Sequence, residues 1–190
     1  MITVRPYSKK DFRFVQDICV ANSQFADEDN AINRATVCAL NCDYYIDNEP
    51  QFCFVLVDDD LPVGYVVCSA DCDNFAEQTD DNYLPLVRKL NSGLFFHFSA
   101  ERKLDQRYIR LGFTAHLRME VLADYASTDN ADKLLQALEN KLTESFVEGV
   151  YVVVPNKDKG AAEFYKRHGF DDIDYIGGAV VYGKKLFSED

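Results

Sequence analysis

The first residues of the chain carry two kinds of apolar periodicity. Ile2 to Arg5 alternates apolar and polar positions and ends at Pro6, which predicts a first strand at the edge of a sheet. Ser8 then stands where a helix N-cap is expected, and apolar residues recur after it at helical spacing. The buried stripe of this helix should consist of Phe12, Val15, Ile18 and Cys19.

A second helix is predicted from about Ala31 to Tyr45, and a hairpin follows it. The two strands of the hairpin are Gln51 to Val57 and Pro62 to Ala70, joined by a turn of three aspartates at positions 58–60. Short polar side chains stabilise turns, so we interpret these carboxylates as a solvated loop and not as a cation site.

The segment from Cys72 to about Gly112 shows no regular pattern. It contains Pro85, Gly93 and an aromatic run of Phe95, Phe96, His97 and Phe98. We therefore expect an irregular insertion at about residues 73–112, between the third and fourth strands. One interpretation of the aromatic run is a dimer interface, in which case the chain forms an oligomer and is mainly an assembly element.

Regular patterning returns after the insertion. Ala115 to Leu122 predicts a strand, and Thr128 or Asp129 can cap the helix after it. The apolar face of that helix should consist of Leu134, Leu135, Leu138, Leu142 and Phe146.

The last segment reads as strand, helix and strand. Val152 to Val154 is a β-branched run, and a helix opens at Gly160 and stops at Gly169, where a left-handed residue is favoured. A final strand is predicted over Ala179 to Lys184. The whole order predicts a single α+β domain over residues 1–190, with a mixed, mostly antiparallel sheet and flanking helices.

Composition and charge narrow the possible partners. The chain has 190 residues, 47% hydrophobic and 27% charged, an ordinary balance for one globular domain. Its 20 basic and 32 acidic residues give a net charge of −12. A polyanion would be repelled, which argues against nucleic acid, whereas a cationic amine would be attracted. No apolar run approaches the ~20 residues of a membrane span, so no membrane association is expected.

All the cysteines lie early in the chain, in apolar surroundings. They are Cys19, Cys38, Cys42, Cys53, Cys68 and Cys72. The chain begins with a strand instead of a signal peptide, so we expect a cytoplasmic protein with buried free thiols. The pairs at 38/42 and 68/72 have four-residue spacing, yet no ligand set with zinc-site spacing completes them, and the sequence predicts no metal.

A spaced set of residues near the C-terminus resembles a known motif. Asp158, Ala161, Tyr165, Gly169 and Phe170 fall at the intervals of the last conserved segment of the GNAT N-acetyltransferases, where Asn is usual in place of Asp158. The order of predicted elements resembles the same fold from end to end. The resemblance implies acetyl-coenzyme A as cofactor and transfer of its acetyl group to a primary amine.

Within that family the chain looks most like the acetyltransferase-like domain of O-GlcNAc hydrolase and its free-standing bacterial relatives. This likeness rests on Val4 to Tyr7, on the hairpin from Phe52 to Tyr65, on the long insertion and on Leu117 to Val121. Some members of that branch lack coenzyme binding, so two functions stay open. One is N-acetyl transfer by direct attack. The other is a catalytically silent module that binds a ligand or a partner.

The resemblance also assigns catalytic roles. The backbone of Met119 and Val121 would bind the pantetheine arm, and Glu120 between them would be the general base for the amine. Tyr165 would then protonate the departing thiolate. From the residues alone, a Glu120 that faces solvent is an equally good interpretation, and Tyr165 can simply pack in the core.

The pyrophosphate loop of the family is matched poorly. The family places Gly or Ala there so that bare amides approach the phosphates. The aligned block here holds Ala126, Ser127, Asp129, Asn130 and Ala131. An amide bound to a phosphate is worth roughly 1.5–3 kcal/mol, whereas an inward carboxylate at about 4 Å costs on the order of 4 kcal/mol. An Asp129 that caps the helix would leave the amides available. We expect acetyl-coenzyme A binding to be weak or lost.

The three histidines allow a relay but do not require one. His116 and Glu120 lie four residues apart on one strand and so share a face. A proton relay between them is one interpretation, and a histidine at the rim of the site is the other. His168 should lie at a helix C-terminus, and His97 belongs to the aromatic run.

The identity of the acceptor is suggested only by charge. Two acidic pairs, Asp71 with Asp73 and Asp80 with Asp81, lead into the insertion. Together with Glu120 they predict a negative potential on the acceptor side, unless they lie far from the site. The acceptor would then be a small polyamine, an aminosugar or a lysine-like amine.

Overall fold

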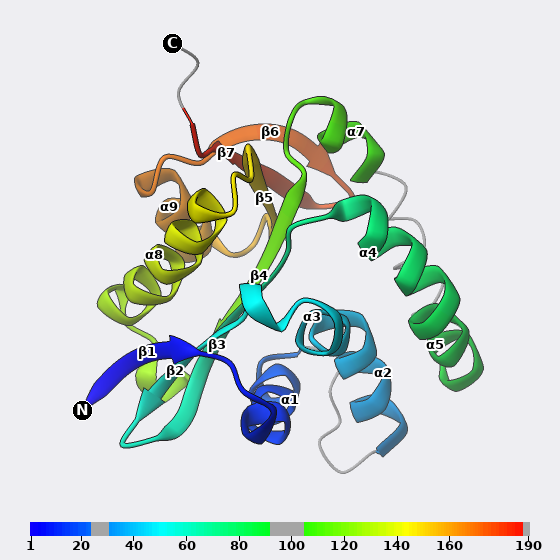
Figure 1. Ribbon diagram of the computed structural model, residues 1–190, viewed down its shortest axis with the longest axis vertical. Helices are drawn as coiled ribbons and strands as arrows, with labels where there is room; N and C mark the ends of the chain where they lie inside the picture. The colour runs from blue at the N-terminus through cyan, green and yellow to red at the C-terminus, as the bar shows by residue number, and fades with distance from the viewer. Residues whose placement is uncertain (24–30, 92–104, 188–190) are drawn as a thin grey trace.

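The fold is described by a computed structural model that covers residues 1–23, 31–91 and 105–187. Its centre is a seven-stranded sheet in the order β1-β2-β3-β4-β5-β7-β6 (Figure 1). The strands are β1 (Ile2–Pro6), β2 (Phe54–Asp58), β3 (Leu61–Ser69), β4 (Ala115–Val121), β5 (Gly149–Pro155), β6 (Asp171–Ile176) and β7 (Ala179–Lys185). Only the β4–β5 pair is parallel, and the other neighbours are antiparallel. The predicted mixed α+β sheet is confirmed.

Helices cover both faces of this sheet. They are α1 (Phe12–Asn22), α2 (Ala31–Asn41), α3 (Asp43–Asn48), α4 (Cys72–Gln78), α5 (Leu84–Leu90), α7 (Asp105–Arg110), α8 (Thr128–Glu144) and α9 (Lys159–Arg167). One apolar cluster joins α8 and α9 to the sheet, and a second joins α1, α2 and α3 to its other face (Figure 1).

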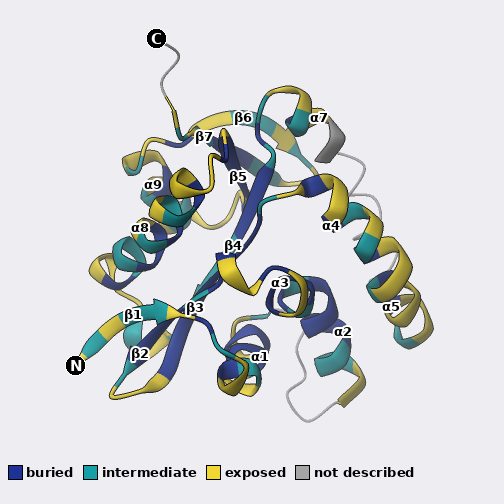
Figure 2. Cartoon of the chain, viewed as in Figure 1, coloured by how far each residue is buried: buried dark blue, intermediate teal, exposed yellow. Residues whose placement is uncertain are grey.

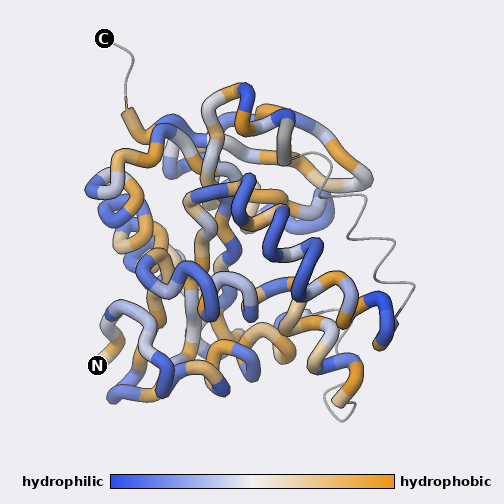
Figure 3. The backbone as a smooth tube through the Cα atoms, turned by 45° about the vertical axis from the view of Figure 1, so that its right-hand side comes forward, coloured by the Kyte–Doolittle hydropathy of each residue, from blue (hydrophilic) through white to orange (hydrophobic). Residues whose placement is uncertain are grey.

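Burial follows this two-sided arrangement. Figure 2 shows most of β5 and the beginning of β4 in dark blue, with exposed residues on the outer sides of the helices. Orange and blue alternate along the helices in Figure 3, as expected where one face meets the sheet and the other meets water. In the part of the chain that the structure describes, every helix is too short or too polar to cross a bilayer.

Two predicted boundaries near the hairpin were wrong. The helix expected over residues 31–45 is two helices, because Cys42 leaves helical geometry with φ −140° and ψ −33°. Because of this break, the side chains of Tyr44, Tyr45 and Ile46 point toward the core and are buried. The first hairpin strand begins at Phe54 because a 3-10 turn occupies Pro50–Phe52.

The expected irregular insertion is mostly helical where it is described. Between β3 and β4 lie α4, a π-helical stretch at Thr79–Tyr83, α5 and α7. Pro85 suggested a break, yet it lies in the first turn of α5, where proline costs no hydrogen bond. The aromatic run Phe95, Phe96, His97 and Phe98 lies outside the described residues, as does Gly93.

Both ends of α8 also differ from the prediction. The N-cap is Ser127, whose hydroxyl accepts from the Asn130 amide, and not Thr128 or Asp129. At the other end Phe146 has φ +58° and is 83% exposed, so it leaves the apolar face of the helix. The reason is that α8 stops at Glu144, and a left-handed residue reverses the chain beyond the stop. The four predicted leucines of α8 are fully buried, as expected.

Candidate functional site

The centre of the sheet opens where β4 and β5 part. Their parallel pairing consists of Ala115 with Val150 and His116 with Tyr151. Beyond His116, β4 stays paired with β3 as far as Val121, while β5 stays paired with β7 as far as Pro155. We call the diverging segments, 117–121 of β4 and 152–155 of β5, the β4–β5 fork. Backbone groups that face into the fork lack a strand partner.

The register shows which β4 residues turn their backbone into the fork. The Leu122 amide donates to the Val63 carbonyl at 2.9 Å, so even-numbered residues of β4 pair with β3. Met119 and Val121 therefore direct their amides and carbonyls toward β5. These are the two positions that the sequence predicted. At the open end, the Asn22 side-chain amide of α1 reaches the Val121 carbonyl at 3.4 Å.

Glu120 lies between these two residues and points to the α1 face of the sheet. Its cross-strand partner is Tyr65, which belongs to the cluster of α1, α2 and α3. Glu120 is half-buried. Burial raises its pKa to about 7, and the neighbouring Cys19 acts in the same direction. A carboxyl group with that pKa is present in both protonation states at neutral pH, which suits a general base.

Tyr165 lies on α9, on the other face of the sheet. Its ring is buried, with edge contacts to Phe164 and Phe170 at centroid distances of 5.1 Å and 5.2 Å. In the described part of the chain its hydroxyl has no hydrogen-bond partner. Burial raises the phenol pKa, and the charge of Glu120 adds to the shift. The phenol is therefore protonated at neutral pH, and it lies close enough to Glu120 to respond to that charge across the fork.

His116 fits neither of its two sequence interpretations. It shares the face of Glu120, but it is 8% exposed, so it is not a rim residue. Its ring bonds to the Tyr45 hydroxyl at 2.8 Å and contacts the Cys72 thiol at 3.4 Å. Burial lowers its pKa to about 3, so the imidazole is neutral. Its hydrogen bonds position α3 and α4 against β4.

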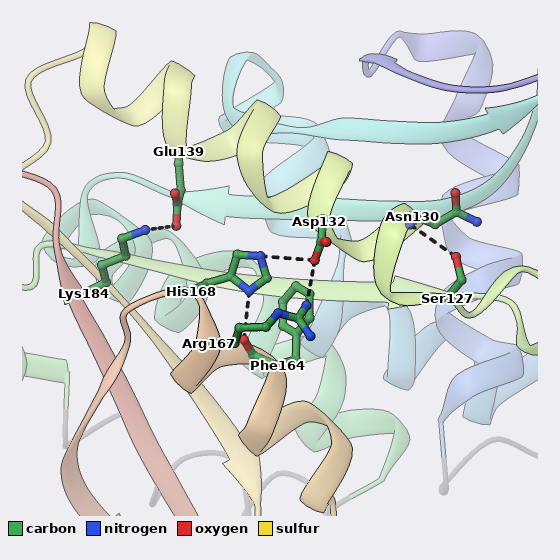
Figure 4. Close-up of polar contacts among 8 residues, drawn as sticks. All are labelled: Ser127, Asn130, Asp132, Glu139, Phe164, Arg167, His168 and Lys184. Atoms are coloured by element: carbon green, nitrogen blue, oxygen red, sulfur yellow. Dashed lines mark hydrogen bonds and ion pairs between the residues drawn. The ribbon is translucent and has the colours of Figure 1, made fainter.

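The loop after β4 leads directly into the N-terminus of α8. A 3-10 turn, Ala123–Tyr125, uses the Ala126 amide, and the Ser127 hydroxyl occupies the Asn130 amide at 3.3 Å (Figure 4). The Asn130 side chain donates to the Tyr125 carbonyl at 2.9 Å and fixes the turn. These bonds do not use the first backbone amides of α8, at Thr128 and Asp129, so both amides can donate to an anion.

Asp129 is neither inward-pointing nor a cap. Its carboxylate is 78% exposed and lies 2.6 Å from the Lys133 ammonium, one turn along α8. The pair is nearly neutral, so the predicted repulsion of a phosphate is much smaller than for a bare carboxylate. The four-residue spacing of Asp129 and Lys133 could have indicated this contact from the sequence. No comparable pattern marks Asn22.

The start of α9 explains why Asp158 can stand where the acetyltransferase motif usually has Asn. Asp158 is the N-cap, and its carboxylate accepts from the Ala161 amide at 2.9 Å. Asp and Asn cap helices equally well, so the exchange keeps the local structure. The carboxylate also acts on the pKa of Glu120 and of Tyr165, which places it beside the fork.

Contacts between α8 and α9 hold this side of the fork together (Figure 4). Asp132 of α8 contacts Arg167 at 2.9 Å and the His168 ring at 3.1 Å. His168 lies at the C-terminus of α9, as predicted, and its ring bonds to the Phe164 carbonyl at 2.8 Å. Glu139 pairs with Lys184 of β7 at 2.7 Å. The two helices are thus fixed against each other and against the sheet.

The acidic pairs lie away from the open end of the fork. Ser69, at the end of β3, pairs with His116 at the closed end, and Asp71 follows as the N-cap of α4. Asp80 and Asp81 lie further along, after α4. The open end is flanked instead by Asn22 and by the turn Gly177–Gly178, whose carbonyl at 178 accepts from the Asn156 amide. Among the residues that the structure describes, Glu120 and Asp158 are acidic groups beside the fork.

Comparisons with known proteins agree with this architecture. No protein-family model matches the chain. Protein O-GlcNAcase of rat is 22% identical over 206 residues, which cover 97% of this chain and 22% of that protein, and the mouse protein matches equally. The chain thus spans about a fifth of the length of these curated relatives.

Two solved structures align over nearly their whole length. The crystal structure of SsHAT has a TM-score of 0.84 and 24% identity, and covers 98% of this chain and 99% of that one. The PaiA N-acetyltransferase of Thermoplasma acidophilum, solved with coenzyme A, has a TM-score of 0.62 and 12% identity, with 97% and 99% covered. These likenesses show that the chain has the fold of the GNAT acetyltransferases.

Proposed function

We propose that this chain, with the fold of the GNAT acetyltransferases, binds acetyl-coenzyme A in the β4–β5 fork and transfers the acetyl group to a primary amine by direct attack. The observation that carries the proposal is the loss of β4–β5 pairing after His116, with Glu120 on one face and Tyr165 on the other. The coenzyme bound to the PaiA N-acetyltransferase supports the choice of cofactor.

The residues present fit the coenzyme. The backbone of Met119 and Val121 would hold the pantetheine arm as an added strand, in the place that β5 vacates. The amides of Thr128 and Asp129 would face the pyrophosphate, and Lys133 would supply a positive charge one turn away. Bound in this way, the coenzyme supplies an activated thioester carbonyl.

The proton transfers follow from the two faces of the fork. Glu120 takes the proton of the ammonium group, directly or through water, and frees the amine nitrogen to attack the carbonyl carbon. As the new C–N bond forms and the C–S bond breaks, Tyr165 would donate its hydroxyl proton to the leaving sulfur, and the second proton lost by the attacking nitrogen would restore the phenol. The raised pKa of Tyr165 keeps that proton in place before the reaction.

One observation favours the alternative of a silent binding module. The loop before α8 has no glycine, and the Ala126 amide is used within the 3-10 turn. Fewer amides are then free for the pyrophosphate than in a glycine loop. Coenzyme affinity separates the two functions, since a silent module need not bind acetyl-coenzyme A.

The Asp129–Lys133 pair gives a direct test of the loop. We expect Asp129→Asn to tighten acetyl-coenzyme A binding by about two- to fivefold, because it removes a screened negative charge. Lys133→Met should weaken binding by a similar factor, because it leaves Asp129 unpaired. Calorimetric titration measures both, with Lys141→Met near the C-terminus of α8 as the control. Affinity changes of the opposite sign, or an equal loss of affinity in Lys141→Met, would show that the loop before α8 does not bind the coenzyme.

The acceptor we propose is a small polyamine, an aminosugar or a lysine-like amine. Glu120 and Asp158 beside the fork and the net charge of −12 favour a cation. We expect the apparent acceptor KM to rise severalfold between low and high salt, because exposed charges are screened within about 8 Å at physiological ionic strength. A panel of amines assayed at both salts tests this. Preference for a neutral acceptor, or a KM independent of salt, would contradict it.

A further inference from the structure

Three buried thiols and one carboxylate meet where α1, α2 and α3 come together. Ligand atoms of Cys38, Cys42 and Asp43 all lie within 4.8 Å of one another. The Cys19 thiol is within hydrogen-bonding range of the thiols of Cys38 and Cys42. The three cysteines are 4%, 1% and 0% exposed, in the order 19, 38 and 42. These three helices pack together on one face of the sheet and lie to the right of its lower strands in Figure 1.

The local structure explains how distant residues converge. Cys38 and Cys42 are four residues apart, so the end of α2 brings them to one side. Helical geometry breaks at Cys42, and Asp43 opens α3 from there. Cys19 comes from the buried stripe of α1, which packs against α2. The sequence could not show this set, because its third thiol is on another helix, 19 positions before Cys38.

We propose that Cys19, Cys38, Cys42 and Asp43 form a zinc site that joins α1 to the α2–α3 junction. Three sulfurs and one carboxylate oxygen make the four-ligand set of a closed structural zinc site. A tetrahedral ion with Zn–S bonds of about 2.3 Å keeps its sulfurs about 3.8 Å apart. The ligand atoms of Cys38, Cys42 and Asp43 already lie within 4.8 Å of one another, and the Cys19 thiol adjoins both of these thiols, so side-chain adjustment completes the geometry. The carboxylate oxygen favours zinc over Cu(I), which selects soft donors alone.

The surroundings support the ligands. The Gln16 side-chain amide donates to Oδ1 of Asp43 at 2.9 Å, the kind of outer contact that orients a ligating carboxylate. The Arg118 guanidinium on β4 acts electrostatically on Cys19 and offsets part of the negative charge of the ligands. Bound zinc would anchor α1, whose last residue, Asn22, contacts Val121 at the open end of the fork.

Two other buried cysteines lie outside this cluster and provide matched controls. Cys53 donates to the carbonyls of Tyr45 and Glu49 at 3.5 Å, and Cys68 to the Ser69 carbonyl at 3.4 Å. Among the residues that the structure describes, Cys38, Cys42 and Asp43 are the one set of three such side chains whose ligand atoms all lie within 4.8 Å of one another, and the Cys19 thiol adjoins this set. Burial alone therefore does not distinguish the site, but convergence of the donor atoms does.

The test is metal binding by the reduced full chain, stripped with a chelator. We expect one Zn²⁺ per chain with a dissociation constant below about 100 nM, measured by competition with a chromophoric chelator. Co²⁺ should give the strong visible bands of tetrahedral coordination and thiolate-to-cobalt charge transfer. Neither metal-binding measurement depends on acetyltransferase activity. Failure of the zinc proposal is therefore distinguishable from failure of the proposed function.

Variants assign the ligands. Cys19→Ser, Cys38→Ser and Cys42→Ser should each weaken zinc binding at least about 100-fold, and Asp43→Asn about 10- to 100-fold. Cys53→Ser and Cys68→Ser should keep both stoichiometry and affinity. If a serine variant does not fold, the cobalt spectrum of the native chain and the Asp43→Asn titration still decide. A native chain that binds no Zn²⁺ and shows no cobalt bands, or loss of binding in the controls instead, would overturn the site.

Discussion

Replacing Glu120 with Gln is expected to lower kcat/KM for amine acetylation by about 100- to 1000-fold, the loss typical of a general base. The same change should stabilise the fold at pH 8. Burial raises the pKa of Glu120 to about 7, from 4.5, so the folded chain favours its protonated form. Gln imitates that form at every pH. Loss of activity with gain of stability is the pattern of a residue retained for function.

The pH dependence of this effect has a definite sign. The folded pKa of Glu120 lies above the unfolded value, so its favourable contribution is fully present below about pH 4.5 and is lost as pH rises through about 7. Glu120→Gln should therefore match the native chain near pH 4.5 and exceed its unfolding free energy by about 1–3 kcal/mol at pH 8. In the native enzyme, kcat/KM should rise through about pH 7 as the base ionises.

Urea unfolding at a series of pH values measures the stability difference, and initial rates measure the activity. Glu139→Gln is the matched control, since Glu139 is also a half-buried carboxylate but pairs with Lys184 outside the fork (Figure 4). That variant should lose stability and keep its turnover. If Glu120→Gln turns over at the native rate, or is less stable than the native chain at pH 8, Glu120 is not the general base and is only a surface residue.

The second large effect is expected from Tyr165→Phe, which should lower kcat by about 100-fold at constant affinity for acetyl-coenzyme A. The change removes one hydroxyl that bonds to no other group among the described residues, so the packing against Phe164 and Phe170 should survive. Loss in kcat without loss of affinity would identify an interaction made only in the transition state.

Tyr182→Phe is the matched control for Tyr165. Both tyrosines are buried in the cluster on the α8 face, but Tyr182 lies on β7. Its variant should retain native kcat and a similar melting temperature. If Tyr165→Phe turns over at the native rate, or if Tyr182→Phe loses as much, the hydroxyl of Tyr165 serves packing alone.

Sequence patterning predicted the sheet because its strands carry β-branched runs and its helices carry single apolar stripes. It predicted that Met119 and Val121 share one backbone direction with Glu120 between them, since a period of two fixes which residues share a direction once one pairing is known. It missed the helices between β3 and β4, where a proline in a first helical turn looks like a break. It also predicted that Phe146 lies on the buried face of α8. The left-handed backbone at Phe146 ends that face, and apolar periodicity does not indicate backbone conformation.

Features that depend on two distant elements could not be predicted. The role of His116 is set by Tyr45 and Cys72, which lie 71 and 44 residues earlier in the chain. The thiol cluster needs Cys19 of α1 beside the α2–α3 junction. The cap at Ser127 and the Asp129–Lys133 pair each involve residues close together in the sequence. The cap was still predicted wrongly, because several adjacent polar residues have similar capping preferences.

A calorimetric titration of the native chain with acetyl-coenzyme A tests the central claim most directly. We expect one site per chain with a dissociation constant of roughly 10 to several hundred micromolar, because a loop without glycine forfeits amide contacts worth about 1.5–3 kcal/mol each. Absence of binding heat at millimolar coenzyme, at two temperatures that exclude a zero enthalpy, would contradict the account and leave the silent module in its place.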